Sequence, residues 1–133
     1  MDLLKKLLST DLEVTKEVYI KRLDEVLRVK GIKDEEFDAI EERATYYEGK
    51  GNKQTKKIDK KQARYMTIAH CLIEPNINSK EVLNALSVEE GWQAVSKLFL
   101  PGEQEILELA MGECSGFAES EVEDAEVVEE VKN

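Results

Sequence analysis

The sequence predicts a mainly α-helical domain of the α+β class, with a short β-hairpin near its N-terminus and an acidic C-terminal tail. Three observations lead to this fold class. Apolar residues recur at helical spacing through residues 34–114, and they alternate in the manner of strands within residues 17–32. Residues 118–133 hold seven acidic residues, one lysine and no aromatic residue. We therefore expect one domain over residues 1–117 and a disordered acidic tail over residues 118–133.

The composition narrows the class of function. The net charge is −10 and 36% of the residues are charged. Because contacts to phosphate need a basic surface, this charge disfavours binding to nucleic acid and to an anionic membrane. Cys71 and Cys114 form no C-x-x-C pair, so we expect buried free thiols in a reducing compartment. No stretch approaches the roughly 20 apolar residues of a membrane span, and we expect a cytoplasmic protein.

The N-terminal residues 2–8 predict one or two helical turns. Four leucines share one face of this segment: Leu3, Leu4, Leu7 and Leu8. A helix this short is marginal in water, so it must dock on something to persist.

The next segment predicts a β-hairpin near residues 17–32. Two alternating runs, residues 17–23 and 26–32, flank Asp24-Glu25, with Val18 and Ile20 on the same side of the first run. A helix is the alternative interpretation.

Residues 34–47 predict a helix that Asp34 caps, with an apolar stripe of Phe37, Ile40 and Ala44. Residues 49–57 contain two glycines and no large apolar residue, which predicts an exposed loop. The loop opens a basic stretch that consists of Lys50, Lys53, Lys56, Lys57, Lys60, Lys61 and Arg64.

The strongest helical pattern covers residues 59–73 and ends before Pro75. A short helix capped by Asn78 or Ser79 should follow, and Ser87 and Glu90 form a capping box for another. Pro101-Gly102 should break the chain before a last helix over residues 103–114. The expected core consists of Tyr65, Ile68, Leu72, Trp92, Val95, Phe99, Ile106 and Leu107.

The sequence contains no recognisable catalytic site, metal site or cofactor motif. His70 is the only histidine, and its neighbour Cys71 points about 100° away on a helix, so the two do not form a catalytic pair. A zinc site needs about four ligands at short spacings, which this chain does not offer. Two alternatives to a protein-binding role remain open. One is an enzyme that uses His70 and a nearby carboxylate, and the other is a regulator that binds nucleic acid through residues 50–64.

Four segments occur in a characteristic order between about Glu17 and Phe117. They read EEFDAIEERAT, YMTIAHCLIEPNI, SKEVLNALSV and AVSKLFLPGEQEILELAMGECSGF. This order resembles the XkdN-like family of phage tail assembly chaperones. The Leu-Pro-Gly-Glu step, followed by an apolar helix that ends near Ser-Gly-Phe, carries most of the resemblance.

The resemblance implies a function without catalysis. Such proteins bind the tape measure protein of a phage tail and keep it soluble in the cytoplasm of the bacterial host. Tail tube subunits then polymerise around the tape measure protein, and the chaperone is absent from the finished virion. The implied partners are the tape measure protein and, further, the tail tube protein, with no nucleic acid, membrane or cofactor.

A chaperone of this kind needs apolar surface that its own core does not use. The residues we expect to supply it are Leu3, Leu4, Leu7, Leu8, Leu109 and Met111. Such a surface could bind an amphipathic client helix, or a second copy as a weak homo-oligomer. The alternative is that the leucines pack on the chain's own domain.

Overall fold

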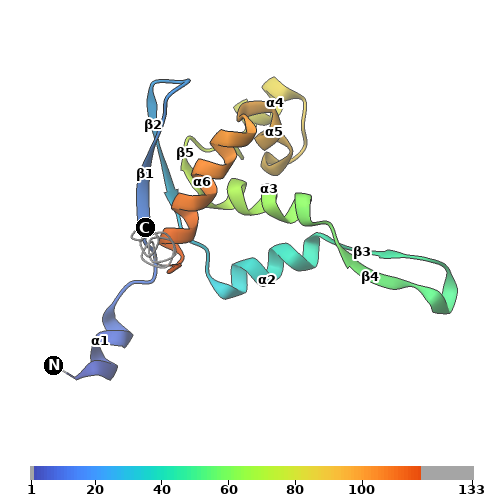
Figure 1. The fold of residues 1–133 in the computed structure, drawn as a ribbon, viewed down its shortest axis with the longest axis horizontal. Helices are drawn as coiled ribbons and strands as arrows, with labels where there is room; N and C mark the ends of the chain where they lie inside the picture. Colours follow the sequence, from blue (N-terminus) through green and yellow to red (C-terminus); the bar gives the residue numbers. More distant parts are fainter. Residues whose placement is uncertain (1, 118–133) are drawn as a thin grey trace, which may run out of the picture.

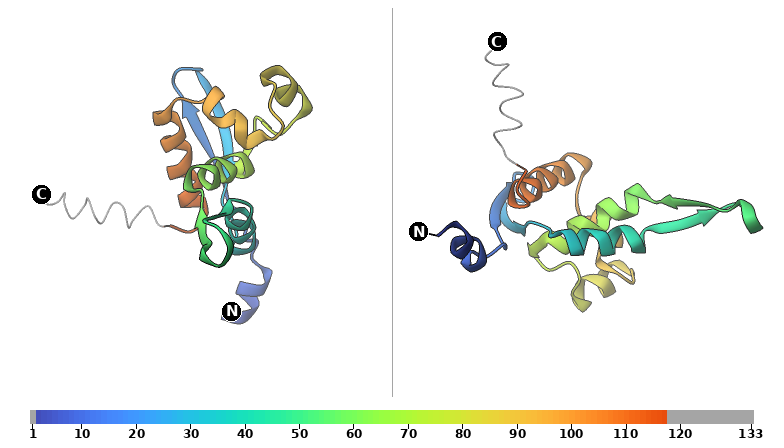
Figure 2. Two further views of the ribbon diagram at one scale, coloured as in Figure 1. Left: turned by 90° about the vertical axis from the view of Figure 1, so that its right-hand side faces the viewer. Right: turned by 90° about the horizontal axis from the view of Figure 1, so that it is seen from below.

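The computed structural model describes residues 2–117, and the acidic tail predicted over residues 118–133 lies outside them. The elements are α1 (Leu3–Ser9), β1 (Thr15–Ile20), β2 (Glu25–Lys30), α2 (Asp34–Arg43), β3 (Thr45–Glu48), η1 (Gly51–Lys53), β4 (Thr55–Ile58), α3 (Lys60–Cys71), β5 (Leu72–Glu74), α4 (Lys80–Leu86), η2 (Gly91–Ala94), α5 (Val95–Leu98) and α6 (Pro101–Cys114). Figure 1 shows α3, α6 and the β1–β2 ribbon at the centre. In the right-hand view of Figure 2, α1 and the β3–β4 hairpin project from opposite sides of this core.

The larger sheet has the strand order β1-β2-β5, and both of its pairings are antiparallel. Val18 lies opposite Leu27, and the inward-facing residues of both strands are buried. Helix α6 packs on β1 and β2, which explains why one side of the hairpin is apolar. A β-hairpin is present in the predicted region, but it covers residues 15–30, with its turn at residues 21–24 and not at Asp24-Glu25.

The predicted fold class is wrong in its β content. The chain is not a helical domain with one hairpin, because the described residues form two sheets and five strands beside six α-helices. The added strand β5 comes from the end of the predicted helix over residues 59–73. That helix ends at Cys71, where Leu72–Glu74 pairs with β2 instead. A pairing between segments more than 40 residues apart leaves no periodic signal in the local sequence.

The second sheet is a hairpin of β3 and β4 that replaces the predicted loop over residues 49–57. The helix predicted over residues 34–47 ends at Arg43, and the chain continues as Thr45-Tyr46-Tyr47. Threonine and tyrosine favour extended backbone, and Gly49 adopts a φ of 106°, a conformation that suits glycine at a turn. The predicted loop is therefore the tip and second strand of a hairpin.

The helix ends differ from the predictions at three caps. Lys33, and not Asp34, is the N-cap residue of α2, and its N–H donates to Glu36 Oε1. Ser87 ends α4 with a φ of 55° and does not begin the next helix. Pro101 is the first residue of α6, a position where its missing N–H costs nothing. The predicted cap at Ser79 is confirmed, since its side chain accepts from the Val82 N–H.

The core lies between α3, α6 and the larger sheet. Of the residues predicted to fill it, Ile68, Leu72, Val95, Phe99 and Leu107 are buried, whereas Tyr65 and Trp92 are partly buried and pack against the core. Ile106 is 45% exposed, so its assignment to the core is wrong. The buried face of α6 is set by Leu107, Ala110, Met111 and Cys114, and Ile106 points about 100° away from Leu107.

Candidate partner-binding surface

The short helix α1 carries the most exposed group of apolar side chains in the described part of the chain. Asp2 accepts a hydrogen bond from the Leu4 N–H at 3.4 Å and caps the helix. None of the α1 residues is buried, and its four leucines are between 61% and 79% exposed. Helix α1 therefore does not pack on the core of its own chain.

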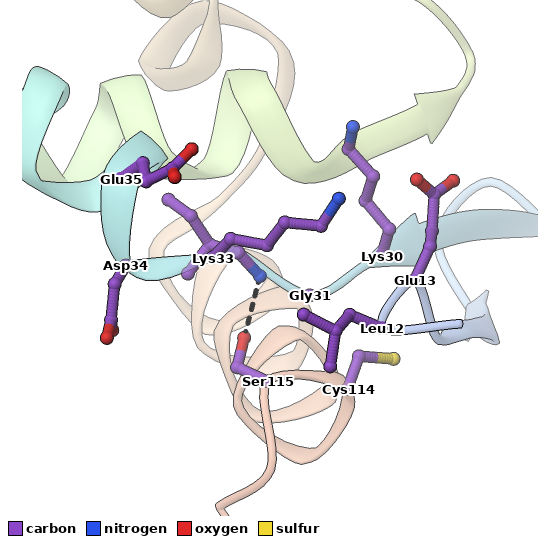
Figure 3. A pocket seen from close by; sticks show the side chains of 10 residues that line it. Leu12, Glu13, Lys30, Gly31, Lys33, Asp34, Glu35, Cys114 and Ser115 are labelled. Atoms are coloured by element: carbon purple, nitrogen blue, oxygen red, sulfur yellow. Dashed lines mark hydrogen bonds between the residues drawn. The ribbon is translucent and has the colours of Figure 1, made fainter. Parts of the chain in front are cut away.

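The exposed apolar surface continues along the segment that joins α1 to β1. Leu12 is 75% exposed and Val14 is 49% exposed. This segment passes beside the C-terminal end of α6, where Leu12 and Cys114 line the same hollow (Figure 3). The leucine helix is thus tethered next to the junction of β2, α2 and α6.

Close backbone packing builds this junction. A Cβ atom on Gly31 would lie 2.4 Å from the Cys114 carbonyl oxygen, so only glycine allows this approach without displacement. The Ile32 N–H donates to Ser115 Oγ at 2.9 Å, the bond dashed in Figure 3. Ser115 Oγ in turn donates to the Met111 carbonyl at 2.7 Å. These contacts join the end of β2 to the last turn of α6.

Two adjoining hollows lie on either side of this junction, and both are lined by Ile32, Lys33, Asp34 and Ser115. The first, of about 380 Å³, opens toward the segment that follows α1. The second, of about 330 Å³, is more apolar, and we call it the apolar groove. Its lining is completed by Phe37, Thr67, Glu108, Met111, Gly112 and Phe117.

The rims of the two hollows carry charges of both signs. Figure 3 shows the side chains of Lys30, Lys33 and Glu13 around the first hollow. Glu36, in the first turn of α2, lies outside the lining of both hollows, and its pKa is lowered chiefly by the hydrogen bond from the Lys33 N–H, with a smaller contribution from His70. An apolar floor with a polar rim is the usual character of a surface that takes an apolar side chain of a partner.

The two partner-binding residues predicted on α6 lie in different environments. Leu109 is 61% exposed and stands three residues from Ile106, so the two form a small apolar patch on the outer side of α6. Met111 is 5% exposed, and it contributes to the floor of the apolar groove.

The surroundings of His70 and Cys71 do not activate a nucleophile. His70 Nε2 lies 3.2 Å from Glu36 Oε1 on the surface of α3, while Cys71 is fully buried. Burial raises the pKa of the Cys71 thiol to about 12, so the thiolate that nucleophilic chemistry requires does not form near neutral pH. Cys71 and Cys114 are buried free thiols, as predicted.

The basic stretch predicted from the sequence lies on the β3–β4 hairpin and on the first turns of α3. Lys57 Nζ is 3.4 Å from Glu48 Oε1 across the hairpin, and Arg64 Nε donates to Glu108 Oε2 at 2.8 Å. The other lysines of the stretch, from Lys50 to Lys61, are exposed. In Figure 1 the hairpin lies far from the leucine helix.

The described residues contain no group of three or more side chains that could hold a metal ion. Nor does any described helix have the length and apolar character needed to span a membrane.

The apolar groove contains residues that sequence reasoning did not assign to a site. Phe37 was predicted as part of an apolar stripe on the helix over residues 34–47, and in the structure it is 40% exposed and lines the groove. Phe117, which is 69% exposed, ends the segment that carries most of the family resemblance. The sequence signal that could have assigned Phe117 to the site is its position as an aromatic residue directly after Ser-Gly, outside the apolar spacing of the last helix.

Comparison with known proteins identifies one family. The profile of the family described as "Phage XkdN-like tail assembly chaperone protein, TAC" matches residues 4–132. The match is longer than the span from Glu17 to Phe117 expected from the sequence, since it includes most of α1 and all seven acidic residues after Phe117. No curated protein and no solved structure is significantly similar to the chain.

Proposed function

The chain belongs to the XkdN-like family of phage tail assembly chaperones, and we propose that it binds the tape measure protein through its exposed leucine helix. The observation that supports this choice is the exposure of Leu3, Leu4, Leu7 and Leu8, none of which packs on the core. Burying a leucine is worth about 1.5–3 kcal/mol, so a soluble chain that leaves four of them in water has a surface suited to an apolar partner.

The client that fits this surface is an amphipathic helix. Before the tail tube polymerises around it, a long helical tape measure protein exposes apolar stripes at helical spacing. These stripes aggregate unless another protein covers them. The four leucines offer one apolar strip. Leu12 and the apolar groove, with Phe37 and Phe117 at its edge, offer an adjoining surface for side chains of the same client helix.

The charge of the chain suits this role. A net charge of −10 on 133 residues keeps a complex with an aggregation-prone client in solution, because like-charged complexes repel one another. We place the protein in the cytoplasm of the bacterial host during assembly. It leaves the client when tail tube subunits polymerise, which makes the tail tube protein a second partner, and it is absent from the virion.

The free chaperone protects its own leucines by weak self-association. A client helix and a second copy of α1 offer the same apolar chemistry, so one surface serves both. The client then displaces the second copy because a long amphipathic helix buries more apolar area than a seven-residue one.

The direct experiment is co-expression with the tape measure protein of the same phage. We expect the unaltered chaperone to keep the client soluble and to co-purify with it, and we expect the Leu4→Ser/Leu7→Ser variant to lose most of this effect. The control is Leu23→Ser, which removes a leucine that is 42% exposed in the β1–β2 turn, away from α1. A client that stays equally soluble with the double variant would reject the leucine helix as the binding surface.

Two further observations separate this function from its alternatives. His70→Ala should leave client solubility unchanged, whereas an enzyme that depends on His70 would lose its activity. In the genome, a tail tube gene upstream and a very long helical gene downstream are expected. Neighbouring genes unrelated to tail assembly would argue against the proposed client.

A further inference from the structure

The β3–β4 hairpin carries a concentration of positive charge that the proposed client binding does not use. Residues 45–64 hold seven basic and two acidic residues, a net charge of +5 in a chain whose total is −10. Lys50 and Lys53 stand at the tip of the hairpin, both exposed, and neither forms an ion pair with another described residue. The tip therefore presents uncompensated positive charge on a projecting arm (Figure 1).

The sides of the hairpin are less available than its tip. Lys57 is already paired with Glu48, and Lys56 shares a hollow with Asp38, Glu41 and Glu42 of α2. Further along, Arg64 is paired with Glu108. An acidic partner would meet carboxylates beside the strands, whereas Glu48, two residues before Lys50, is already paired with Lys57. The tip is therefore the part of the basic stretch that suits such a partner.

The same chain contains a segment of opposite charge. Residues 118–133 hold seven acidic residues and one lysine, which gives the side chains a net charge of −6. The family match extends to residue 132, so this acidic segment belongs to the matched region and is not an unrelated extension.

The acidic segment follows Phe117 at the apolar groove, whereas the basic tip lies at the far end of the β3–β4 hairpin. Phe117, the last described residue, lines the apolar groove together with Phe37 in the first turn of α2. From there the rest of α2 and the strand β3 run in line toward the hairpin tip in Figure 1. At about 1.5 Å per helical residue and about 3.3 Å per strand residue, the tip lies roughly 25 Å from the groove.

This distance limits a contact within one chain to the far part of the acidic segment. The middle of the acidic segment, Glu123 to Glu126, comes about eight residues after Phe117. Eight residues span roughly 27 Å when fully extended, so within one chain only Glu126, Glu129 and Glu130 come far enough along the segment to reach the tip. If a second copy lies antiparallel to the first, its acidic segment starts beside the first copy's hairpin. The length of the segment then does not limit the contact.

We propose that the hairpin tip of one copy, at Lys50 and Lys53, binds the acidic segment 118–133 of a second copy. A two-fold axis makes the contact reciprocal, so each pair of chains forms two equivalent contacts. The second contact then forms within an already associated pair, which compensates for the weakness of exposed ion pairs. This association goes beyond the proposed binding of the tape measure protein, and it uses no residue of the leucine helix.

The proposal predicts self-association that salt suppresses. At about 0.05 M salt, sedimentation velocity of the full chain should show a mass that rises with concentration, and at about 0.5 M salt the rise should shrink because screening shortens the range of the attraction. Association through leucines does not weaken with salt, so the Leu4→Ser/Leu7→Ser background isolates the charged contact.

The decisive variants are charge reversals. Lys50→Glu/Lys53→Glu should raise the dissociation constant on the order of fivefold or more at low salt. The matched control is Lys21→Glu/Lys97→Glu, which changes the net charge equally at two exposed lysines outside the hairpin. A mixture of Lys50→Glu/Lys53→Glu with a Glu123→Lys/Glu126→Lys copy should associate again, because one contact pairs the two unaltered parts and the other pairs the two altered parts. A chain that carries all four changes should also associate, because both of its contacts then pair altered parts of opposite charge.

Three results would overturn the proposal. The first is equal weakening by the control pair, which would reflect net charge alone. The second is a salt-sensitive contact between tip and tail in a chain that stays monomeric, which would place the contact within one molecule. The third is loss of binding to double-stranded DNA by the tip variant with no change in self-association, which would assign the hairpin to nucleic acid.

Discussion

Single residues stabilise this fold in two ways: some bury apolar side chains in the core, and others form charged contacts between elements. Ile68 is fully buried at the centre of α3, and Arg22 reaches from the β1–β2 turn to Glu103 in the first turn of α6. The guanidinium Nε lies 2.7 Å from Glu103 Oε2 and Nη2 lies 2.8 Å from Oε1, so the pair is bidentate. Glu103 is buried, and the Leu100 N–H donates to it as well. One carboxylate thus joins the sheet to the start of α6.

Removing the Ile68 side chain should destabilise the fold strongly. Ile68→Ala leaves a cavity in a packed core, and we expect a loss of about 2–5 kcal/mol in the free energy of unfolding. Ile106→Ala is the matched control, because Ile106 is 45% exposed and should cost less than about 1 kcal/mol. Urea unfolding followed by the fluorescence of Trp92, the only tryptophan, measures both. Equal losses would mean that Ile106 belongs to the core after all.

The contact between Arg22 and Glu103 should make stability depend on pH in the acid range. Arg22 first, and the Leu100 N–H second, hold the pKa of Glu103 below its usual value of about 4.3. A lowered folded-state pKa stabilises the fold above the unfolded pKa, and this contribution is lost as the pH falls through the folded pKa. Glu103→Gln should therefore lower the melting temperature at pH 7 and have little effect at pH values below the folded pKa. A difference that grows in acid would contradict this assignment.

At the scale of elements, the junction of β2, α2 and α6 shows how local sequence and close packing combine. Helix α6 buries Leu107, Ala110, Met111 and Cys114, and its last turn meets the end of β2 at Gly31. The absence of a side chain at Gly31 lets two backbones touch, and Gly31 and Cys114 both line the first hollow. The apolar groove adjoins this contact through Ile32 and Ser115, which line both hollows.

Gly31→Ala should destabilise the protein, because the new methyl group would lie 2.4 Å from the Cys114 carbonyl oxygen. Backbone on both sides limits relaxation, and we expect a loss of about 1–3 kcal/mol in the free energy of unfolding. Gly102→Ala provides the control. No atom lies within 4 Å of its added Cβ, and a helical alanine should leave stability unchanged or raise it by up to about 1 kcal/mol. Equal destabilisation by both substitutions would refute the close approach at Gly31.

At the scale of the whole molecule, a compact core carries two projections with different chemistry. One is the leucine helix α1 and the other is the basic β3–β4 hairpin, and Figure 2 shows them on opposite sides of the core. The first suits an apolar partner, whereas the second suits an acidic one. Such separation allows client binding and charge-dependent self-association to be tested by independent variants.

The leucine helix should affect association without affecting folding. Leu4→Ser/Leu7→Ser changes two side chains that are 61% and 67% exposed, so the free energy of unfolding should move by less than about 0.5 kcal/mol each. At high salt, where charged contacts are screened, sedimentation of the variant should show weaker self-association than the unaltered chain. A marked drop in melting temperature with unchanged association would assign the leucines to the core.

Much of the fold follows from local patterns in the sequence. The spacing of Ile68 and Leu72 predicted α3, alternation predicted β1 and β2, and four leucines on seven residues predicted α1. The family was also predicted, from the order of four short segments. Turns and helix caps require particular residue types, so their order can be recognised in the sequence. These features depend on residues close in sequence, where the periodicity of helix and strand acts directly on side-chain burial.

Other features depend on residues distant in sequence, and only the tertiary structure decided them. Leu72–Glu74 is a strand because β2 offers an edge to it, and the β3–β4 pairing turns a predicted loop into a projecting hairpin. Ile106 is exposed because the sheet covers the opposite side of α6. The apolar groove exists because the start of α2 lies beside α6, which brings Phe37 and Met111 together from positions more than 70 residues apart. Each is a contact between surfaces, and the free energy of such a contact belongs to the pair of surfaces and not to either local sequence.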